Sequence, residues 1–371
     1  MALKVLFCDN SLRELLNFRG DVIRHFVQQG YEVVLVAPQT VDDFALELWQ
    51  VRYIPIELNR SGMNPLQDWK YWRRLCRVYR EEKPDYVFHY TIKPNIYGTL
   101  AARWCGVRSS AMVAGLGYVF YKKGIRCWIA RKLYQFALRY AEHVLVLNAS
   151  NKDMLLSRHI VSINKIIHLK GGEGVNLQQF AIREKGETTE KVVFLMIARL
   201  LYDKGYDEYV HAAEEVRKRF PNAEFQLLGG LDVSYPNHVT EERLRRDVDR
   251  GNVRYLGYCS DVTSKIQASD CVVLPSYNEG LSRVLMEAIA MGKVVVTTDI
   301  PGCRETVDES ENGFLIPVRD FKALAAACTK VIELGSEERA KMGVYSRRKA
   351  EAVFDIQDVI CVYDDMLLKG I

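Results

Sequence analysis

The sequence predicts an α/β protein made of two Rossmann-like halves, each with a doubly wound parallel sheet. Along most of the chain, short apolar runs alternate with segments whose apolar residues recur at helical spacing. A glycine-rich break at 171–176 and a polar stretch at 183–191 separate two such series, and 371 residues exceed what one core usually supports. We therefore expect domains at residues 1–175 and 190–350, with a helix at 351–371 that packs back on the first domain.

The first half begins with an apolar run that predicts a buried strand, and the same pattern recurs six times. Strands are expected at 4–8, 32–37, 53–56, 86–89, 111–114, 143–147 and 166–169, and helices at 18–29, 65–83 and 96–104. Ligands of such sheets bind beyond the carboxyl ends of the strands, which places segments 9–20, 90–95 and 115–118 at the ligand edge. The first of these loops lacks the G-x-G-x-x-G fingerprint of dinucleotide binding.

The second half repeats the alternation. Strands are expected at 192–198, 225–228, 253–256, 271–274 and 294–298, and helices at 206–219, at 240–250 and, in a short form, up to 269. Loops that follow these strands meet at one sheet edge, so the sequence predicts a second ligand site there.

The stretch 274–288 has the pattern of a strand that turns into a helix at Glu279-Gly280. Gly280 would let the backbone approach a ligand, and the N–H groups of the first helical turn favour an anion or a polyol. Glu279 and Glu287 lie eight positions apart, or roughly 12 Å along a helix, which suits the two ends of a sugar joined through phosphates to a ribose. The alternative is an acidic residue near a helix N-terminus and a solvated glutamate, and spacing alone does not separate the two.

Two cations follow the first strand of the second half. Arg199 and Lys204 are expected at the same sheet edge as Glu279. An enzyme that breaks a sugar–diphosphate bond must stabilise negative charge on the leaving phosphate, and two fixed cations do so with little reorganisation. An arginine and a lysine at this spacing after a strand are weak evidence by themselves. Together with Glu279-Gly280 in the same half, they favour a site for a sugar diphosphate.

Composition narrows the function classes. No apolar run approaches the ~20 residues of a membrane span, and the N-terminus leads directly into a strand pattern, so we expect no signal peptide. Nine scattered cysteines without a C-x-x-C pair indicate reduced thiols in a cytosolic protein. No D-x-D or other acidic cluster suggests a catalytic metal.

Basic, amphipathic segments stand out in the first half. Residues 121–140 combine an apolar stripe, which contains Trp128, with Lys122, Lys123, Arg126 and further cations, and residues 69–80 repeat this pattern. Such a face suits an anionic bilayer surface, although each stripe could instead pack on its own sheet. Nucleic-acid binding is not expected, because the excess charge is confined to these two helices.

The motifs resemble those of the GT4 family of retaining glycosyltransferases with the GT-B fold. The resemblance is carried by 198–200 with Lys204-Gly205, by 275–280 and by Glu287-Ala288. Segments 91–98, 115–117 and 196–199 are similar to the branch that extends glycans on undecaprenyl diphosphate, including PglA-type N-acetylgalactosaminyltransferases. This resemblance implies two domains facing across a cleft and a reaction that needs no metal or other cofactor.

The resemblance also implies roles for individual residues. Arg199 and Lys204 would bind the donor diphosphate and Glu279 the sugar hydroxyls. Glu287 would bind the ribose, and Gly229-Gly230 with the loop at Gly257-Tyr258 would flank the nucleobase. Gly280, Leu281 and Ser282 would offer backbone N–H groups to the sugar and phosphate. Many family members carry a histidine after the strand at 111–114, where this chain has Gly115-Leu116-Gly117, so His89 and His168 are candidates by proximity only.

The resulting hypothesis is retaining transfer of a hexose or N-acetylhexosamine from a nucleotide sugar, expected to be a UDP-sugar, to a polyprenyl-diphosphate-linked acceptor. The acceptor diphosphate would contact Lys93, Lys122, Lys123 and Arg126, and the enzyme would be cytoplasmic and peripherally attached to the inner face of the membrane. A nucleotide-sugar epimerase of the same fold and a non-catalytic membrane-associated binding protein are the alternatives. Acceptor-dependent release of nucleotide separates the first hypothesis from both.

Overall fold

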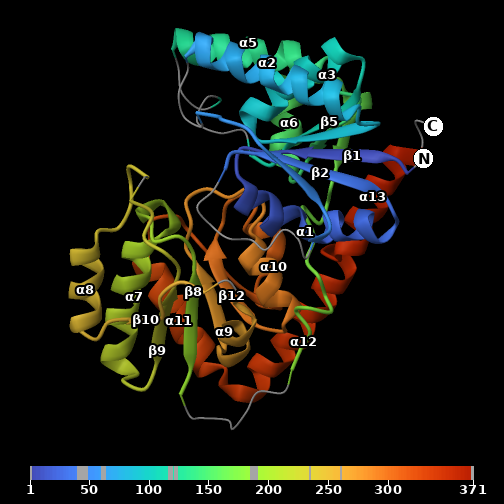
Figure 1. Ribbon diagram of the computed structural model, residues 1–371. Coiled ribbons are helices and arrows are strands. Elements are labelled where there is room, and N and C mark those ends of the chain that lie inside the picture. The colour runs from blue at the N-terminus through green and yellow to red at the C-terminus, as the bar shows by residue number, and fades with distance from the viewer. Residues whose placement is uncertain are drawn as a thin grey trace. The chain divides into compact units, whose positions relative to one another are not determined.

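The computed structural model describes residues 2–39, 49–59, 64–115, 120, 124–183, 191–233, 235–259 and 261–368. The chain divides into two compact units, the first formed by Met1–Glu173 with Gln357–Ile371 and the second by Gly174–Ile356. The boundary therefore lies inside the glycine-rich break at 171–176. The C-terminal residues return to the first unit (Figure 1).

A parallel sheet forms the centre of the first unit. Its seven strands, counted over the described residues, run in the order β3-β2-β1-β4-β5-β6-β7. They span β1 Lys4–Cys8, β2 Glu32–Ala37, β3 Arg52–Pro55, β4 Tyr86–Tyr90, β5 Arg108–Val113, β6 Val144–Val146 and β7 Ile166–His168. The expected strands of this half are thus confirmed within a few residues at their ends.

Helices cover both faces of this sheet because successive strand residues point to opposite sides. Leu6 and Cys8 of β1 pack against α2 and α3, whereas Phe7 between them contacts Phe26 of α1 with ring centroids 5.9 Å apart. The helices of this unit are α1 Leu12–Gln28, α2 Pro65–Glu82, α3 Thr99–Cys105, α5 Ile125–Leu138, α6 Ala149–Ser157 and α13 Ile356–Leu368, with short turns at Pro94–Gly98 and Ile163–Lys165.

Helix α13 packs on the face of the sheet that α1 covers. The ring of Tyr363 lies 4.8 Å from that of Phe88 in β4, centroid to centroid, and Asp364 lies 2.9 Å from Nε2 of His25 in α1. These contacts attach the C-terminal helix to the first unit.

The second unit repeats the architecture with a six-stranded parallel sheet, again within the described residues, in the order β10-β9-β8-β11-β12-β13. The strands span β8 Val193–Ile197, β9 Glu224–Leu228, β10 Arg254–Tyr255, β11 Cys271–Leu274, β12 Val294–Thr298 and β13 Gly313–Ile316. The helices are α7 Tyr206–Arg219, α8 Glu241–Asp249, α9 Thr263–Ala268, α10 Arg283–Ala290, α11 Phe321–Glu333 and α12 Gly335–Val353, with short turns at Tyr202–Lys204 and Arg304–Thr306.

Helix α1 begins earlier than the sequence pattern indicated. Ser11 caps its N-terminus by accepting a hydrogen bond from the N–H of Glu14 at 3.3 Å, which satisfies one of the donors that a helix start leaves free. Arg19 and Gly20 therefore belong to a helix, and the expected ligand loop at 9–20 is reduced to Asp9, Asn10 and Ser11. The strand β13 and the helices α11 and α12 were not expected from the sequence.

Candidate functional site

The carboxyl edge of the second sheet gathers most of the predicted donor-site residues. Arg199 follows β8, Gly229-Gly230 follow β9, Tyr258 follows β10 and Glu279 follows β11. These four strands are adjacent in the order β10-β9-β8-β11 and are all parallel, so their carboxyl ends lie at one edge. The topology places these residues on the same edge of one sheet, as the hypothesis requires.

Lys204 and Glu279 form an ion pair, with Nζ 2.6 Å from Oε1. Their side chains are only 21% and 15% exposed, so solvent screens the pair less than a surface pair. Lys204 uses one of its three donors on Glu279, so its ammonium group has capacity for further hydrogen bonds. The pair therefore holds a cation and a carboxylate in fixed positions at the sheet edge.

Backbone packing brings these two residues together. The N–H of Tyr277 donates to the carbonyl of Asp203 at 2.9 Å, which joins the loop after β11 to the turn that contains Lys204. Gly205 ends that turn with φ +81°, and a Cβ built there would lie 2.2 Å from the carbonyl oxygen of Pro275. Only glycine fits both the left-handed backbone and this approach.

Arg199 is the more exposed of the two cations, with 53% of its side chain accessible. Its Nη1 donates to Asp232 at 3.0 Å, and its guanidinium carbon lies 5.4 Å from the ring centroid of Tyr235. Asp232 gave no signal in the sequence, because a single acidic residue in a loop has no distinguishing pattern. The aspartate orients Arg199 and also competes with any anion for it.

Gly229 and Gly230 pack closely against the chain that follows β8. Gly229 has φ +152°, and a Cβ built on it would lie 1.8 Å from the carbonyl oxygen of Ala198. The carbonyl of Gly230 accepts the N–H of Leu200 at 3.0 Å. Tyr258 is 62% exposed beside Gly230, with its Cδ2 3.9 Å from the position of a Cβ built there.

Helix α10 begins three residues later than expected, which changes the role of Ser282. The Ser282 side chain accepts a hydrogen bond from the N–H of Leu285 at 3.4 Å and caps the helix. Its own N–H donates to the carbonyl of Gly302 at 2.8 Å. This N–H is therefore already engaged within the protein, and Gly280 and Leu281 lie in the loop before the cap.

Glu287 lies in the middle of α10 and is only 6% exposed. Burial raises the pKa of its carboxyl, although Nε of Arg283 lies 2.8 Å from Oε1 and lowers it. A carboxylate accepts hydrogen bonds at both oxygens, so the pair with Arg283 leaves capacity for a second partner.

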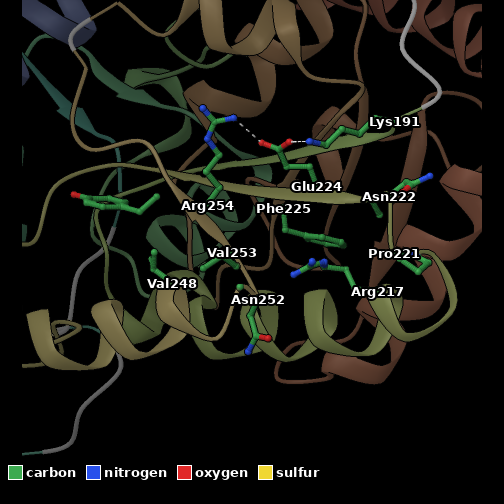
Figure 2. A pocket seen from close by; sticks show the side chains of 13 residues that line it. Lys191, Arg217, Pro221, Asn222, Glu224, Phe225, Val248, Asn252, Val253 and Arg254 are labelled. Carbon is green, nitrogen blue, oxygen red and sulfur yellow. Dashed lines mark hydrogen bonds and ion pairs between the residues drawn. The ribbon is translucent and has the colours of Figure 1, made fainter.

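A pocket of about 630 Å³ in the second unit lies at the opposite edge of its sheet. Figure 2 shows Lys191 and Arg254 both reaching Glu224, and Glu224 and Arg254 are the first residues of β9 and β10. This pocket is therefore separated from Arg199 and Lys204 by the length of the strands and does not form part of the candidate site.

The predicted acceptor and membrane residues of the first unit are only partly described. Lys122, Lys123 and the Arg126 side chain lie outside the described residues. Lys93 forms an ion pair with Asp68, with Nζ 2.6 Å from Oδ1. Its side chain is 13% exposed, so this ion pair is largely buried. Trp128 on α5 is 51% exposed.

His89 lies in the hydrophobic core of the first unit and not at its surface. It is fully buried in β4, where its Nε2 lies 2.8 Å from the hydroxyl of Tyr79, and burial lowers the pKa of its ring to about 3. A Cβ built on Gly98 would lie 2.3 Å from the His89 ring, so close packing holds the imidazole in place. The neutral, buried ring is a core residue. His168 lies in β7 with part of its surface exposed.

Comparison with known proteins identifies both units. Residues 18–166 match the model of a glycosyl transferase 4-like domain, and residues 178–349 match that of glycosyl transferases group 1. An N,N'-diacetylbacillosaminyl-diphospho-undecaprenol alpha-1,3-N-acetylgalactosaminyltransferase from Campylobacter jejuni is 27% identical over 96% of each chain. A UDP-Gal:alpha-D-GlcNAc-diphosphoundecaprenol alpha-1,3-galactosyltransferase from Escherichia coli is 27% identical over 72% of this chain and 71% of its own.

Solved structures show the same fold. A glycosyltransferase from Rickettsia africae superposes with a TM-score of 0.81 at 17% identity, covering 99% of this chain and 98% of its own. Anabaena HepE in complex with UDP superposes with a TM-score of 0.79 at 18% identity, covering 99% of this chain and all of its own. The two parallel-sheet units have the GT-B fold, and the two domain matches together span both of them. The chain therefore belongs to the glycosyltransferases that combine a 4-like domain with a group 1 domain.

Proposed function

We propose that this glycosyltransferase moves a hexose or N-acetylhexosamine from a nucleotide sugar, with UDP as the nucleotide, to a sugar on a polyprenyl diphosphate, with retention at the anomeric carbon. The observation that carries the proposal is the sheet edge of the second unit, where Arg199 and the Lys204–Glu279 pair stand at the ends of adjacent strands. The names of the Campylobacter and Escherichia relatives, which act on undecaprenyl-diphosphate-linked sugars, support the acceptor class.

In the proposed reaction, Arg199 and Lys204 stabilise the negative charge that grows on the departing diphosphate. Two preorganised cations act without reorganisation at the moment of bond cleavage. Glu279 both fixes Lys204 and accepts hydrogen bonds from hydroxyls of the transferred sugar. Glu287 binds ribose hydroxyls, and Gly229, Gly230 and Tyr258 flank the base. This chemistry places charge stabilisation on side chains, and no resident metal is required.

An apolar face on the first unit supports peripheral attachment to an anionic membrane surface. The helices α2, α3 and α5 share this face (Figure 1). The rings of Trp72 in α2 and Trp104 in α3 meet edge to face, with their centroids 5.9 Å apart. Its exposed large side chains are Leu66, Trp69, Trp104, Ile125, Trp128, Ile129, Phe136 and Tyr140. Exposed apolar groups among arginines and lysines favour an anionic lipid interface.

The stripe on α5 is exposed because other residues of this helix make the core contacts. Tyr134, Ala137 and Leu138 are at most 2% exposed, whereas Ile125, Trp128 and Ile129 are at least 51% exposed. On α2, by contrast, Cys76 and Tyr79 pack inward, so only the first turns of that helix contribute to the face. No helix in the described ranges is long and apolar enough to cross a bilayer.

The direct test is a screen of nucleotide sugars against short-chain polyprenyl-diphosphate sugars, with product mass measured by mass spectrometry and anomeric configuration by NMR. We expect one hexose or N-acetylhexosamine to be added to the lipid-linked sugar with the anomeric configuration of the donor retained. Inversion of configuration, or nucleotide release that does not depend on any polyprenyl-linked acceptor, would contradict the proposal.

A further inference from the structure

A pocket of about 720 Å³ with both polar and apolar walls lies at the carboxyl edge of the first sheet. Its walls come from the residues after β2, the residues after β3 and the first turns of α2. The volume falls within the range of small-molecule sites, roughly 300–1,000 Å³. The carboxyl edge is also where open parallel sheets bind their ligands. None of the donor-site residues named above lines this pocket, since all of those belong to the second unit.

The inner wall of the pocket contains a buried, oriented carboxylate. Asp68 is 8% exposed; its Oδ1 binds Nζ of Lys93 at 2.6 Å, and its Oδ2 accepts the hydroxyl of Tyr97 at 3.0 Å. Each oxygen retains a lone pair, because an ionised carboxylate accepts about four hydrogen bonds. Asp68 is therefore held in one orientation and can still accept bonds from hydroxyl groups.

The rim of the pocket carries donors and acceptors in nearly equal measure. Asn59 and Gln67 face each other from the loop after β3 and from α2, with the amide nitrogen of Asn59 3.2 Å from Oε1 of Gln67. Arg74 and Glu57 form a second link across the same opening at 2.5 Å, with the glutamate side chain 85% exposed. Sugar hydroxyls both donate and accept, so a mixture of amides, carboxylates and cations suits a polyol better than an apolar or purely anionic ligand.

Helix α2 joins this pocket to the apolar face. Gln67 and Lys70 line the pocket, and the neighbouring Leu66 and Trp69 are 72% and 51% exposed. The guanidinium carbon of Arg73 lies 4.9 Å from a ring centroid of Trp69, which adds a cation at the boundary between the two surfaces. A ligand with a neutral sugar, an anionic linker and a lipid tail would meet these three environments in that order.

We propose that the pocket lined by Asn59, Gln67 and Asp68 binds the sugar of the polyprenyl-diphosphate-linked acceptor. The inference rests on the proposed function and adds to it the location of the acceptor sugar. The diphosphate lies toward Lys70 and Arg73, and the prenyl chain continues along Leu66 and Trp69 to the membrane.

The test measures binding of a short-chain polyprenyl-diphosphate monosaccharide to the full chain by calorimetry. The variant Asn59→Ala/Gln67→Ala removes two exposed amides that are hydrogen-bonded to each other at the pocket rim. We expect its Kd for the sugar-bearing ligand to rise about tenfold, as the loss of one to two hydrogen bonds implies. Its Kd for the same polyprenyl diphosphate without a sugar, and for UDP, should stay unchanged.

The matched control is Gln28→Ala/Gln29→Ala, which removes two exposed amides at the C-terminal end of α1 in the same unit. If the pocket variant, the control and the unmodified chain have equal Kd values for the sugar-bearing ligand, the pocket does not bind the acceptor sugar. The proposed function would then remain intact. If the pocket variant binds the sugar-free polyprenyl diphosphate as much more weakly as it binds the sugar-bearing ligand, the pocket binds the diphosphate, and the proposal that it binds the sugar is overturned. Failure of the unmodified chain to bind any polyprenyl-diphosphate sugar would contradict both proposals.

Discussion

Nζ of Lys204 lies 2.6 Å from Oε1 of Glu279, although 75 positions separate the two residues in the chain. The turn after β8 and the loop after β11 meet because the two strands are neighbours in a parallel sheet. The pair therefore places one cation and one carboxylate at the sheet edge, where the proposed reaction needs both.

Removing the cation of this pair should lower turnover strongly. In Lys204→Met the leaving diphosphate loses one preorganised partner, and we expect kcat to fall by about 10²–10³-fold with the fold intact. Glu279→Gln keeps an oxygen that accepts from Lys204, so its loss of kcat should be smaller. Steady-state kinetics with the donor varied measure both, and thermal unfolding checks that each variant is folded. A near-normal kcat in Lys204→Met would show that Lys204 does not stabilise the departing diphosphate.

Removing Arg199 and neutralising its partner Asp232 should have opposite effects on the diphosphate site. Arg199→Ala should lower kcat by at least tenfold, because one cation of the diphosphate site is lost. Asp232→Asn should strengthen inhibition by the product nucleotide, since the aspartate now holds Nη1 of Arg199 at 3.0 Å and competes with phosphate. Arg254→Ala is the matched control, because Arg254 is also exposed and also pairs with an acid, at the opposite edge of the sheet. If Arg199→Ala behaves like this control, Arg199 does not contact the donor.

The turn at Gly205 should tolerate no side chain. In Gly205→Ala the left-handed backbone costs about 1–2 kcal/mol, and the contact of 2.2 Å with the carbonyl of Pro275 adds to that cost. Gly251→Ala is the control for backbone strain alone, since it has φ +71° and its nearest built contact is 3.7 Å. Urea unfolding should show a larger loss of stability for Gly205→Ala. Equal losses in the two variants would mean that the loop after β11 moves aside without cost.

Asp9 should make the protein less stable as the pH rises. It is 3% exposed at the end of β1, and burial raises the pKa of its carboxyl to about 7, although Arg19 lowers it. In the unfolded chain the carboxyl ionises near pH 4. Between pH 4 and pH 7 the folded state thus keeps a proton that the unfolded state has released, and stability falls over this window.

Replacing Asp9 by Asn should remove this pH dependence. We expect Asp9→Asn to raise the free energy of unfolding at pH 8 by up to about 4 kcal/mol, while at pH 4 it should have little effect. Denaturant unfolding at the two pH values measures the difference, and Asp21→Asn on α1 serves as the control. A stabilisation that is the same at pH 4 and pH 8 would show that Asp9 is not the titrating group.

The apolar face of the first unit should govern membrane binding. Replacing both Trp69 and Trp128 by Ser removes two side chains that are each 51% exposed. Since burying a large apolar side chain contributes about 1.5–3 kcal/mol, we expect at least a tenfold loss of affinity for vesicles that contain phosphatidylglycerol. Ile163→Ser, which removes a 60% exposed side chain elsewhere in this unit, is the control in a flotation assay. Unchanged flotation of the double variant would show that this face does not bind the membrane.

Some features of the fold and the site depend on tertiary structure, because a local sequence pattern can be compatible with more than one structure. The segment 9–20 fits a ligand loop as well as a capped helix, since a serine before an apolar run suits either a turn or a cap. In the structure Ser11 caps α1. The N–H of Ser282 was expected to bind a ligand, but the distant Gly302 accepts it. The stripe on α5 could have packed inward or outward, and which side faces the sheet depends on the neighbouring strands.

The sequence by itself determined the two parallel-sheet domains and most of their strands, because apolar periodicity reports directly on which local structure can be buried. It did not indicate β13, α11 or α12. It also determined which cations and carboxylates stand at strand ends, since a strand end is a local feature. Only the tertiary structure decided which of these groups pair, as Lys204 does with Glu279 and Lys93 with Asp68. Such pairing depends on the lateral order of the strands and on backbone contacts such as that between Gly205 and Pro275, which join segments far apart in the chain.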